Sequence, residues 1–251
     1  MAYQFDSRVR YSETGMDRKL KMVSLVDYFQ DCSTFQSESL GCGLDYMEAN
    51  NLAWMVLSWQ IEIVRRPSLG EKITVQTWPY GFKAFYGYRN FALTDERGEY
   101  AARANSVWVL MDLAAGRPCK VISEYTDKYV LEPQLAMETS SRKIKIPEES
   151  VVQEAFSVCQ HHLDTNNHVN NGQYIRMAED YLPAGFETGR LCVEYRQQAR
   201  LHDVIIPKVH EEADLVVVSL CGEEDKVYSV VSFARSQAQE QVKTSFPRRN
   251  R

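Results

Sequence analysis

The chain has 251 residues, of which 44% are hydrophobic and 25% are charged, and its net charge at pH 7 is −5. A chain of this length can form one large domain or two small ones, each with a substantial apolar core. An excess of acidic residues argues against nucleic acid as the main partner, because duplex-binding domains are usually basic. No apolar run reaches the ~20 residues of a membrane span, and the first residues lack the apolar core of a signal peptide. We therefore expect a cytoplasmic protein without a membrane span.

The six cysteines are spread along the chain and form no C-x-x-C pair. Because nothing indicates export and a chain of this length does not depend on disulfides, we expect reduced, mostly buried thiols. These residues are Cys32, Cys42, Cys119, Cys159, Cys192 and Cys221.

The first half predicts a short extended segment, one amphipathic helix and four strands. The extended segment covers residues 3–11, and apolar residues then recur at helical spacing from Met22 to Cys32. Polar residues occupy the opposite side of this helix: Asp27, Gln30, Asp31 and Thr34. We expect strands at 52–64, 72–78, 84–94 and 101–111.

A polar, charged stretch over 138–150 separates this half from a second one with the same order of elements. We expect extended chain at 154–162, a helix over 171–182 and strands at 190–195, 204–209, 215–220 and 227–233. The predicted organisation is a first repeat at 1–140, a linker at 141–150 and a second repeat at 151–251, with a frayed tail at 237–251.

Local similarity between the halves supports a duplication. Ten residues from Glu62 resemble ten residues from Glu194 at one register, and Ser12-Glu-Thr resembles Leu163-Asp-Thr. The repeated unit predicts one helix covered by an antiparallel sheet, which is an α+β arrangement. Two such units can pair their sheets within one chain.

The most unusual segment is Gln160-His-His-Leu-Asp-Thr-Asn-Asn-His-Val-Asn-Asn-Gly. Asp164, Asn166 and His168 stand at alternating positions, which in extended chain places all three on one side. If the helix begins near residue 167 or 168, they gather at its amino end, where free N–H groups and the dipole suit a developing oxyanion. Asp can fix the tautomer of a neighbouring His, and Asn can orient water or donate to a carbonyl.

Two other interpretations of this segment stay open. Asp and Asn are common before helices, because their side chains cap free N–H groups. A metal site is the weaker alternative: His161 and His162 add ligands at a spacing that matches no common zinc site, and Val169 and Ile175 break the calcium-loop pattern. The sequence contains no G-x-S-x-G elbow and no Walker A loop.

The segment Leu163-Asp-Thr-Asn-Asn-His-Val-Asn-Asn, followed by Val193-Glu-Tyr-Arg-Gln-Gln-Ala-Arg, resembles the acyl-ACP thioesterase family. Members of this family release fatty acids from acyl carrier protein. Their D-x-N-x-H-V-N-N signature is met from Asp164 to Asn171, and Tyr11-Ser-Glu-Thr-Gly resembles the start of their first repeat. The similarity covers about residues 3–235.

This resemblance implies a double hotdog fold, in which two helix-wrapped antiparallel sheets are continuous and form an intramolecular pseudo-dimer. It also implies water-mediated thioester hydrolysis without metal or cofactor, with acyl carrier protein and its fatty acyl chain as the partner. Asp164, Asn166 and His168 match catalytic positions of the family. A homodimer is compatible with the sequence, which does not fix the oligomeric state.

One departure from the family affects the mechanism. Gln198 falls where the plant members have a catalytic Glu, and Ala199 falls where a Cys nucleophile was once proposed. Gln198 can hold a water molecule but cannot accept its proton. We therefore expect Asp164, directly or through His168, to activate water, with Glu194 as the base if the local alignment shifts. Asn166 and helix-terminal N–H groups would bind the thioester carbonyl.

Two further features belong to this interpretation. The family's acyl slot lies in the first repeat, where candidate lining residues are Phe29, Phe35, Trp54, Met55 and Trp59. Docking an acidic carrier protein needs a basic patch, and candidate clusters are Arg18/Lys19/Lys21, Arg65/Arg66 and Arg142/Lys143/Lys145. The competing functions are an acyl-CoA thioesterase of the same fold and a non-catalytic acyl-thioester sensor.

Overall fold

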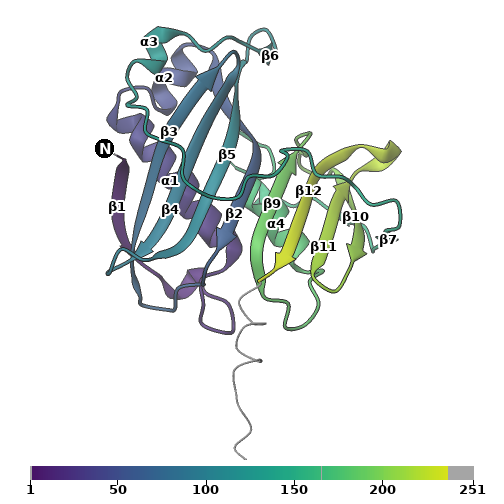
Figure 1. Ribbon diagram of the computed structural model, residues 1–251. Helices are drawn as coiled ribbons and strands as arrows, with labels where there is room; N and C mark the ends of the chain where they lie inside the picture. Colours follow the sequence, from purple (N-terminus) through teal and green to yellow (C-terminus); the bar gives the residue numbers. More distant parts are fainter. Residues whose placement is uncertain (1, 165, 237–251) are drawn as a thin grey trace, which may run out of the picture.

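The computed structural model describes residues 2–164 and 166–236. Its main strands form one antiparallel sheet in the order β1-β3-β4-β5-β2-β9-β12-β11-β10-β7 (Figure 1). The first half comprises β1 (Tyr3–Arg8), the 3₁₀ turn η1 (Tyr11–Glu13), α1 (Met22–Ser39), α2 (Leu44–Ala49), β2 (Leu52–Ile63), β3 (Lys72–Lys83), β4 (Tyr86–Asp95), β5 (Tyr100–Asp112), β6 (Arg117–Pro118) and α3 (Ser123–Thr126).

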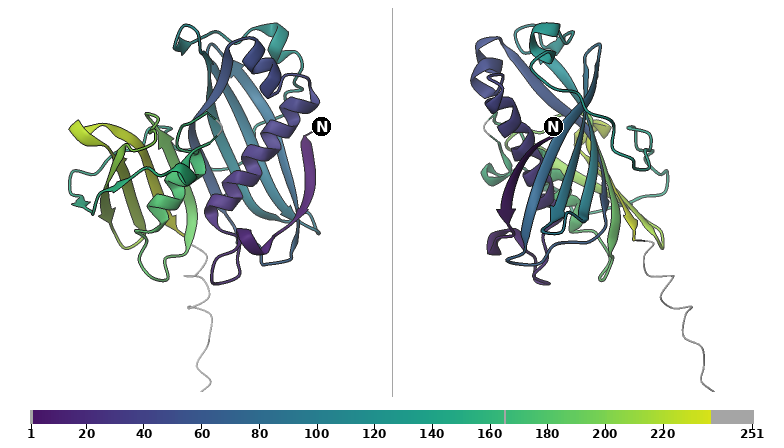
Figure 2. Two further views of the ribbon diagram at one scale, coloured as in Figure 1. Left: turned by 180° about the vertical axis from the view of Figure 1, so that it is seen from behind. Right: turned by 60° about the vertical axis from the view of Figure 1, so that its left-hand side comes forward.

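The second half is shorter and repeats the arrangement around a smaller helix. It comprises β7 (Val151–Val152), β8 (Phe156–Ser157), the 3₁₀ turn η2 (Gln160–His162), α4 (Asn171–Glu179), β9 (Thr188–Tyr195), β10 (Val204–Glu211), β11 (Leu215–Cys221), η3 (Glu223–Asp225) and β12 (Val227–Arg235). Both α1 and α4 lie on the same face of the sheet, whereas the chain between the halves crosses the other face (Figure 2).

The apolar stripe of α1 explains why this helix packs on the sheet. Val26, Phe29 and Cys32 are fully buried, and the Phe29 ring stacks on Trp59 of β2 with 6.2 Å between ring centroids. Burying each large apolar side chain stabilises the fold by roughly 1.5–3 kcal/mol. The stripe therefore fixes which side of α1 meets the sheet and leaves its polar side free to face α4.

The two halves join through strand pairing between β2 and β9. The ladder runs from Ser58 opposite Glu194 to Glu62 opposite Arg190. On the outer face the connecting chain is held by hydrogen bonds, among them Ile144 N to the Glu194 carboxylate at 2.9 Å. The continuous sheet with one main helix packed on it in each half confirms the expected α+β double hotdog arrangement.

The predicted strands and both main helices are present, with shifted ends. The α1 helix extends to Ser39, α4 ends at Glu179, and the extended segment at 154–162 contains only the two-residue β8. The short helices α2 and α3 were not predicted, because fewer than two turns give no detectable periodicity. The predicted frayed tail, 237–251, lies outside the described residues.

None of the six cysteines takes part in a disulfide in the described structure. Burial is less general than predicted, because only Cys32, Cys42 and Cys221 are buried. None of the helices within residues 2–164 and 166–236 combines the length and the apolar character needed to cross a bilayer.

Candidate functional site

The D-x-N-x-H motif lies in a closed turn between η2 and α4, which we call the motif loop (163–170). Leu163 and Val169 face each other in an isolated antiparallel bridge, and Asp164 N donates to the His168 carbonyl at 2.8 Å. Asn167 adopts a positive φ of 58°. The chain here is turned rather than extended, so the alternating spacing does not by itself place the three side chains on one side.

Asp164 organises this loop through its carboxylate. Its Oδ1 atom accepts N–H groups from Asn166 at 2.8 Å and from His168 at 3.2 Å. Asp164 and His168 are half-buried, and Asn166 is exposed. The contact between Asp164 and His168 therefore runs through the backbone amide, and it fixes the loop that presents the imidazole.

The helix after the loop begins where the apolar spacing predicted, and not near residue 167 or 168 as the interpretation of the motif required. It starts at Asn171, and its cap is Asn170, whose Oδ1 accepts Gly172 N–H at 2.8 Å. The motif residues therefore precede the cap, and the capping role that was left open belongs to Asn170. His168 stands two residues before this cap, close enough for the loop and the helix end to form one surface.

The second motif segment, residues 193–200 at and after the end of β9, is hydrogen-bonded directly to the motif loop. Val169 N donates to the Ala199 carbonyl at 3.0 Å, and Ala199 N donates to the Tyr174 hydroxyl of α4 at 2.9 Å. The adjacent Gln198 is exposed, with Nε2 3.9 Å from the Met55 sulfur of β2. The β2–β9 ladder stops at Ser58. Gln198 therefore lies beside the part of β2 that no longer pairs with β9, at the seam between the halves.

Glu194, the alternative base, does not belong to this site. Its neighbour Tyr195 donates its hydroxyl to the Asn171 carbonyl at 2.9 Å, on the helix face of the sheet. Successive strand residues point to opposite faces. The Glu194 carboxylate accordingly faces the connecting chain, where it accepts Ile144 N and Arg196 Nη2, each at 2.9 Å.

The neighbouring histidines support the loop. His162 Nδ1 accepts Cys159 N–H at 3.0 Å, and burial, with smaller contributions from His161 and Arg176, lowers the pKa of His162. The ring therefore stays neutral and keeps this acceptor at physiological pH. Within the described parts of the chain, no group of three or more His, Cys, Asp or Glu side chains is placed to hold a metal ion.

The first half contributes residues to the same place through α1. Asn171 Nδ2 donates to Gln30 Oε1 at 3.1 Å. A Cβ atom added to Gly172 would lie 3.0 Å from Val23 Cγ2 and 3.1 Å from Asp27 Oδ1, so α1 and α4 approach closely here. The sequence placed Asp27 and Gln30 only on the polar side of the helix. Their i, i+3 spacing places both side chains on one side of α1, and this was the only indication in the sequence that the polar side of α1 could contact another element.

An equivalent loop precedes α1, and we call it the paired loop (14–21). Thr14 bridges Leu20, Gly15 N donates to the Lys19 carbonyl at 3.0 Å, and Leu20 N donates to the Pro67 carbonyl at 2.8 Å. These bonds repeat the pattern of the motif loop. They confirm the register that aligns Glu62 with Glu194, because Pro67 then corresponds to Ala199.

The same pattern corrects the second local similarity between the halves. Gly15 takes the place of Asp164, whereas the alignment of Ser12-Glu-Thr with Leu163-Asp-Thr would have placed Glu13 there. That three-residue resemblance was two positions out of register.

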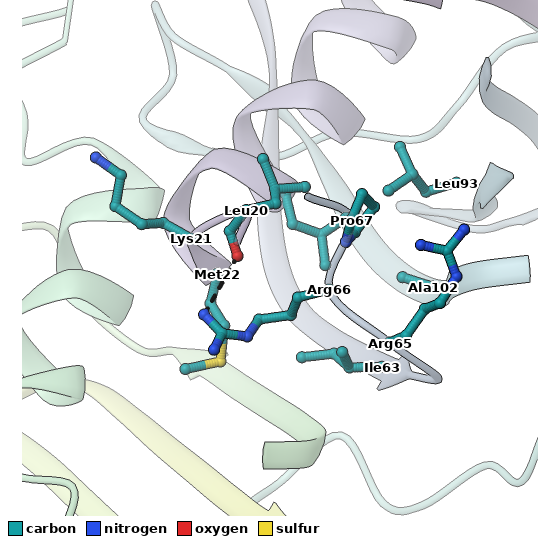
Figure 3. A pocket seen from close by; sticks show the side chains of 10 residues that line it. Leu20, Lys21, Met22, Ile63, Arg65, Arg66, Pro67, Leu93 and Ala102 are labelled. Carbon is teal, nitrogen blue, oxygen red and sulfur yellow. Dashed lines mark hydrogen bonds between the residues drawn. The ribbon is translucent and has the colours of Figure 1, made fainter. Parts of the chain in front are cut away.

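Two small cavities in the described part of the structure lie away from the motif loop. One of about 10 Å³ lies at the paired loop, between Leu20, Met22 and Arg66 (Figure 3). Another of about 40 Å³ lies under the connecting chain, next to Gln60 and Cys192. Neither of these two is bordered by Asp164 or His168.

The aromatic residues predicted to line an acyl slot are mostly packed against other side chains. Phe29 and Trp59 are fully buried in the core, and Trp54 Nε1 donates to the Tyr125 hydroxyl at 2.7 Å. Phe35 is 45% exposed. The slot in the first repeat therefore stays a prediction.

Comparison with known proteins gives two family matches that together cover most of the chain. The model of the acyl-ACP thioesterase N-terminal domain matches residues 1–129, and that of the acyl-ACP thioesterase C-terminal domain matches residues 145–246. An acyl-[acyl-carrier-protein] hydrolase of Cuphea viscosissima is 29% identical over 213 residues, which are 78% of this chain and 52% of the relative. Oleoyl-acyl carrier protein thioesterase 1 of Arabidopsis thaliana is 27% identical over 226 residues, 82% of this chain and 62% of the relative. The chain thus spans about half to three fifths of the length of these relatives.

Solved structures share the fold along nearly the whole chain. An acyl-ACP thioesterase from Bacteroides thetaiotaomicron superposes with a TM-score of 0.84 at 21% identity and covers 94% of this chain and 98% of its own. The 12:0-ACP thioesterase from Umbellularia californica gives a TM-score of 0.81 at 18% identity, covering 94% and 97%. At these identities the likeness establishes the fold.

Proposed function

Because this chain belongs to the acyl-ACP thioesterase family, we propose that it hydrolyses the thioester between an acyl chain and acyl carrier protein. The observation that carries this proposal is the hydrogen bond between Val169 N and the Ala199 carbonyl. It joins the two motif segments, some thirty residues apart, at the amino end of α4. The site thereby combines polar side chains, a group that can hold water, and the amino end of a helix. Asn170 already accepts the Gly172 and Gln173 N–H groups there, so these two are not free to bind the thioester carbonyl as the sequence interpretation expected.

Each part of this site has a role in thioester hydrolysis. Asp164 fixes the motif loop through two backbone amides, so that Asn166 and His168 are presented in a defined geometry. The amino end of α4 favours negative charge, which suits the oxyanion that forms on the thioester carbonyl. The exposed Gln198 amide orients the attacking water by hydrogen bonding.

The proposed substrate is an acyl group carried by acyl carrier protein, and the proposed location is the cytoplasm. The family match supports the carrier-bound substrate. Six free cysteines, three of them not buried, fit a reducing compartment.

The test is to incubate the purified protein with a panel of acyl-ACPs and, in parallel, with the matching acyl-CoAs. We expect free thiol and free fatty acid in equal amounts from acyl-ACP, at a higher kcat/KM than from acyl-CoA. Faster turnover of acyl-CoA would contradict the proposed substrate. Binding of acyl-ACP without release of thiol would identify a sensor and contradict the proposed reaction.

A further inference from the structure

Asp27 is a carboxylate of the first half that lies against the amino end of the second-half helix. Its Oδ1 atom would be 3.1 Å from a Cβ on Gly172, the second residue of α4. The neighbouring bond from Asn171 Nδ2 to Gln30 Oε1 holds α1 and α4 together at this level. Figure 2 shows the two helices side by side on one face of the sheet.

The site needs a proton acceptor, and a carboxylate at the helix end adds one to the His168 imidazole and the second oxygen of Asp164. Water attacking a thioester must lose a proton, and the Gln198 amide cannot take it. One oxygen of Asp164 already accepts two backbone N–H groups. Glu194 faces the opposite side of the sheet, where it holds the connecting chain.

Asp27 has the surroundings of a general base. Among the described residues no hydrogen bond or ion pair engages its carboxylate. Asp27 is an exposed residue, so water reaches the side chain and the packing against α4 desolvates its carboxylate only in part. Burial of the carboxylate, with the charges of Asp31 and Glu13, raises the pKa of Asp27 to about 6 against the opposing effect of Lys21. Tyr195 of β9 also lies within electrostatic reach of Asp27, and burial raises its pKa well above the usual value, so it stays neutral. A base with a pKa slightly below physiological pH is ionised and still able to accept a proton.

We propose that Asp27 is the general base of this site and accepts the proton of the attacking water. This assignment rests on the proposed hydrolysis. As the Asp27 carboxylate takes one proton from water, the water oxygen forms a bond to the thioester carbon and the carbonyl electron pair moves to oxygen. When the carbonyl re-forms, the C–S bond breaks, sulfur leaves with the electron pair, and the proton on Asp27 passes to sulfur. The products are a carboxylic acid and a thiol.

The site is then composite, because the motif loop comes from the second half and the base from the first half. The paired loop of the first half lacks a matching carboxylate from α4. Arg176 is the sixth residue of α4, as Asp27 is of α1, so a cation replaces the carboxylate at the equivalent place. The close approach at Gly172 brings the base to the helix end.

The test is the variant Asp27→Asn, with Asp31→Asn as the matched control one turn further along α1. We expect Asp27→Asn to lower kcat on acyl-ACP by ~100-fold or more, as loss of a general base does, and Asp31→Asn to change it less than about threefold. Wild type should gain activity with pH along a limb near pH 6, and Asp27→Asn should lose that limb. Asp27→Glu should restore part of the activity, because it returns a carboxylate.

Stability separates this role from a structural one. A carboxyl group whose pKa is raised by folding destabilises the folded state once it ionises. Asp27→Asn should therefore melt at the wild-type temperature or above it at neutral pH while losing activity. Near-normal kcat with an unchanged acidic limb would overturn the assignment and leave the hydrolase function intact. An inactive wild type would overturn the proposed function and this assignment together.

Discussion

The motif loop and the paired loop share one pattern of backbone hydrogen bonds but differ in their side-chain interactions. Each follows a 3₁₀ turn, closes with an antiparallel bridge and ties its end to the chain after the seam strand. Among the described residues of the motif loop no side chain forms an ion pair, and Asn170 caps the helix. In the paired loop Arg66 pairs with Asp17, and Lys21 stands at the cap position without a side-chain cap.

This difference shows how a duplicated fold can keep one site. The backbone pattern alone supports a helix start in both halves. An ion pair closes the paired loop, and the corresponding positions of the motif loop hold Asn166 and the exposed Gln198. Under the proposed function the side chains that replace the salt bridge form the site, so substitutions at equivalent positions should have unequal effects.

The largest difference is expected at the two loop aspartates. Asp164→Ala removes the acceptor of two backbone N–H groups, so the loop should lose its geometry and kcat/KM on acyl-ACP should fall by ~100-fold or more. Asp17→Ala, the matched change in the paired loop, should leave kcat/KM within about twofold, because surface ion pairs contribute little.

The variant Asp164→Asn sharpens this test. An Asn oxygen can still accept both N–H groups, so this variant should keep most of the activity that Asp164→Ala loses. If the two variants are equally inactive, the negative charge at this position takes part in the reaction itself.

Glu179, the last residue of α4, lies near Lys21 of the paired loop, and it should make the stability of the protein depend on pH. Burial, with a smaller contribution from Asp180, raises the pKa of Glu179 to about 7, although Arg66, Arg176 and Lys21 oppose the shift. The folded state therefore binds more protons than the unfolded state between the ordinary pKa of Glu and about 7, and the free energy of unfolding should fall as pH rises through that window.

The variant Glu179→Gln should remove this fall and raise the free energy of unfolding above pH 7 by up to about 3 kcal/mol. Denaturant unfolding of both proteins across the window measures it. Equal pH dependence in variant and wild type would show that Glu179 has no such shift.

The close helix contact at the motif loop should tolerate no side chain at position 172. The Cβ of Gly172→Ala would meet Val23 Cγ2 at 3.0 Å and Asp27 Oδ1 at 3.1 Å, so we expect a loss of about 1–3 kcal/mol of stability from overpacking. The double variant with Val23→Ala should recover part of this loss if the contact is its cause. Thermal melts of the single and double variants decide between these outcomes.

A smaller effect is expected where α4 holds the Gln198 segment. Tyr174→Phe leaves the buried Ala199 N–H without its acceptor, which costs about 1–2 kcal/mol. Because Gln198 is adjacent, KM or kcat should change severalfold while the secondary structure stays intact. Unchanged kinetics would separate Gln198 from the reaction.

Much of this molecule could be predicted from sequence, for reasons that particular elements show. The helical spacing from Met22 to Cys32 predicted α1 because burial against the sheet requires it. The ten-residue similarity from Glu62 and from Glu194 predicted the correct alignment of the two halves at these strands. The motif could be recognised in the sequence because Asp164 and His168 are polar side chains closely spaced just before a predicted helix.

What could not be predicted depends on contacts between the halves. The turn at Asn167 breaks the alternation that an extended chain would have, and no local pattern shows that Asp164 Oδ1 receives two amides. Asp27 looked like any solvated residue of an amphipathic helix. Only the approach of α4 at Gly172 places it at the site, and that approach is a tertiary contact.

Direct attack by water is the central claim, and a single turnover in water enriched in heavy oxygen tests it. With enzyme in excess over acyl-ACP, we expect one heavy oxygen atom in each fatty acid released, together with one equivalent of thiol. Acid released without the label in that first turnover would contradict direct attack, because its new oxygen would then come from a side chain of the protein.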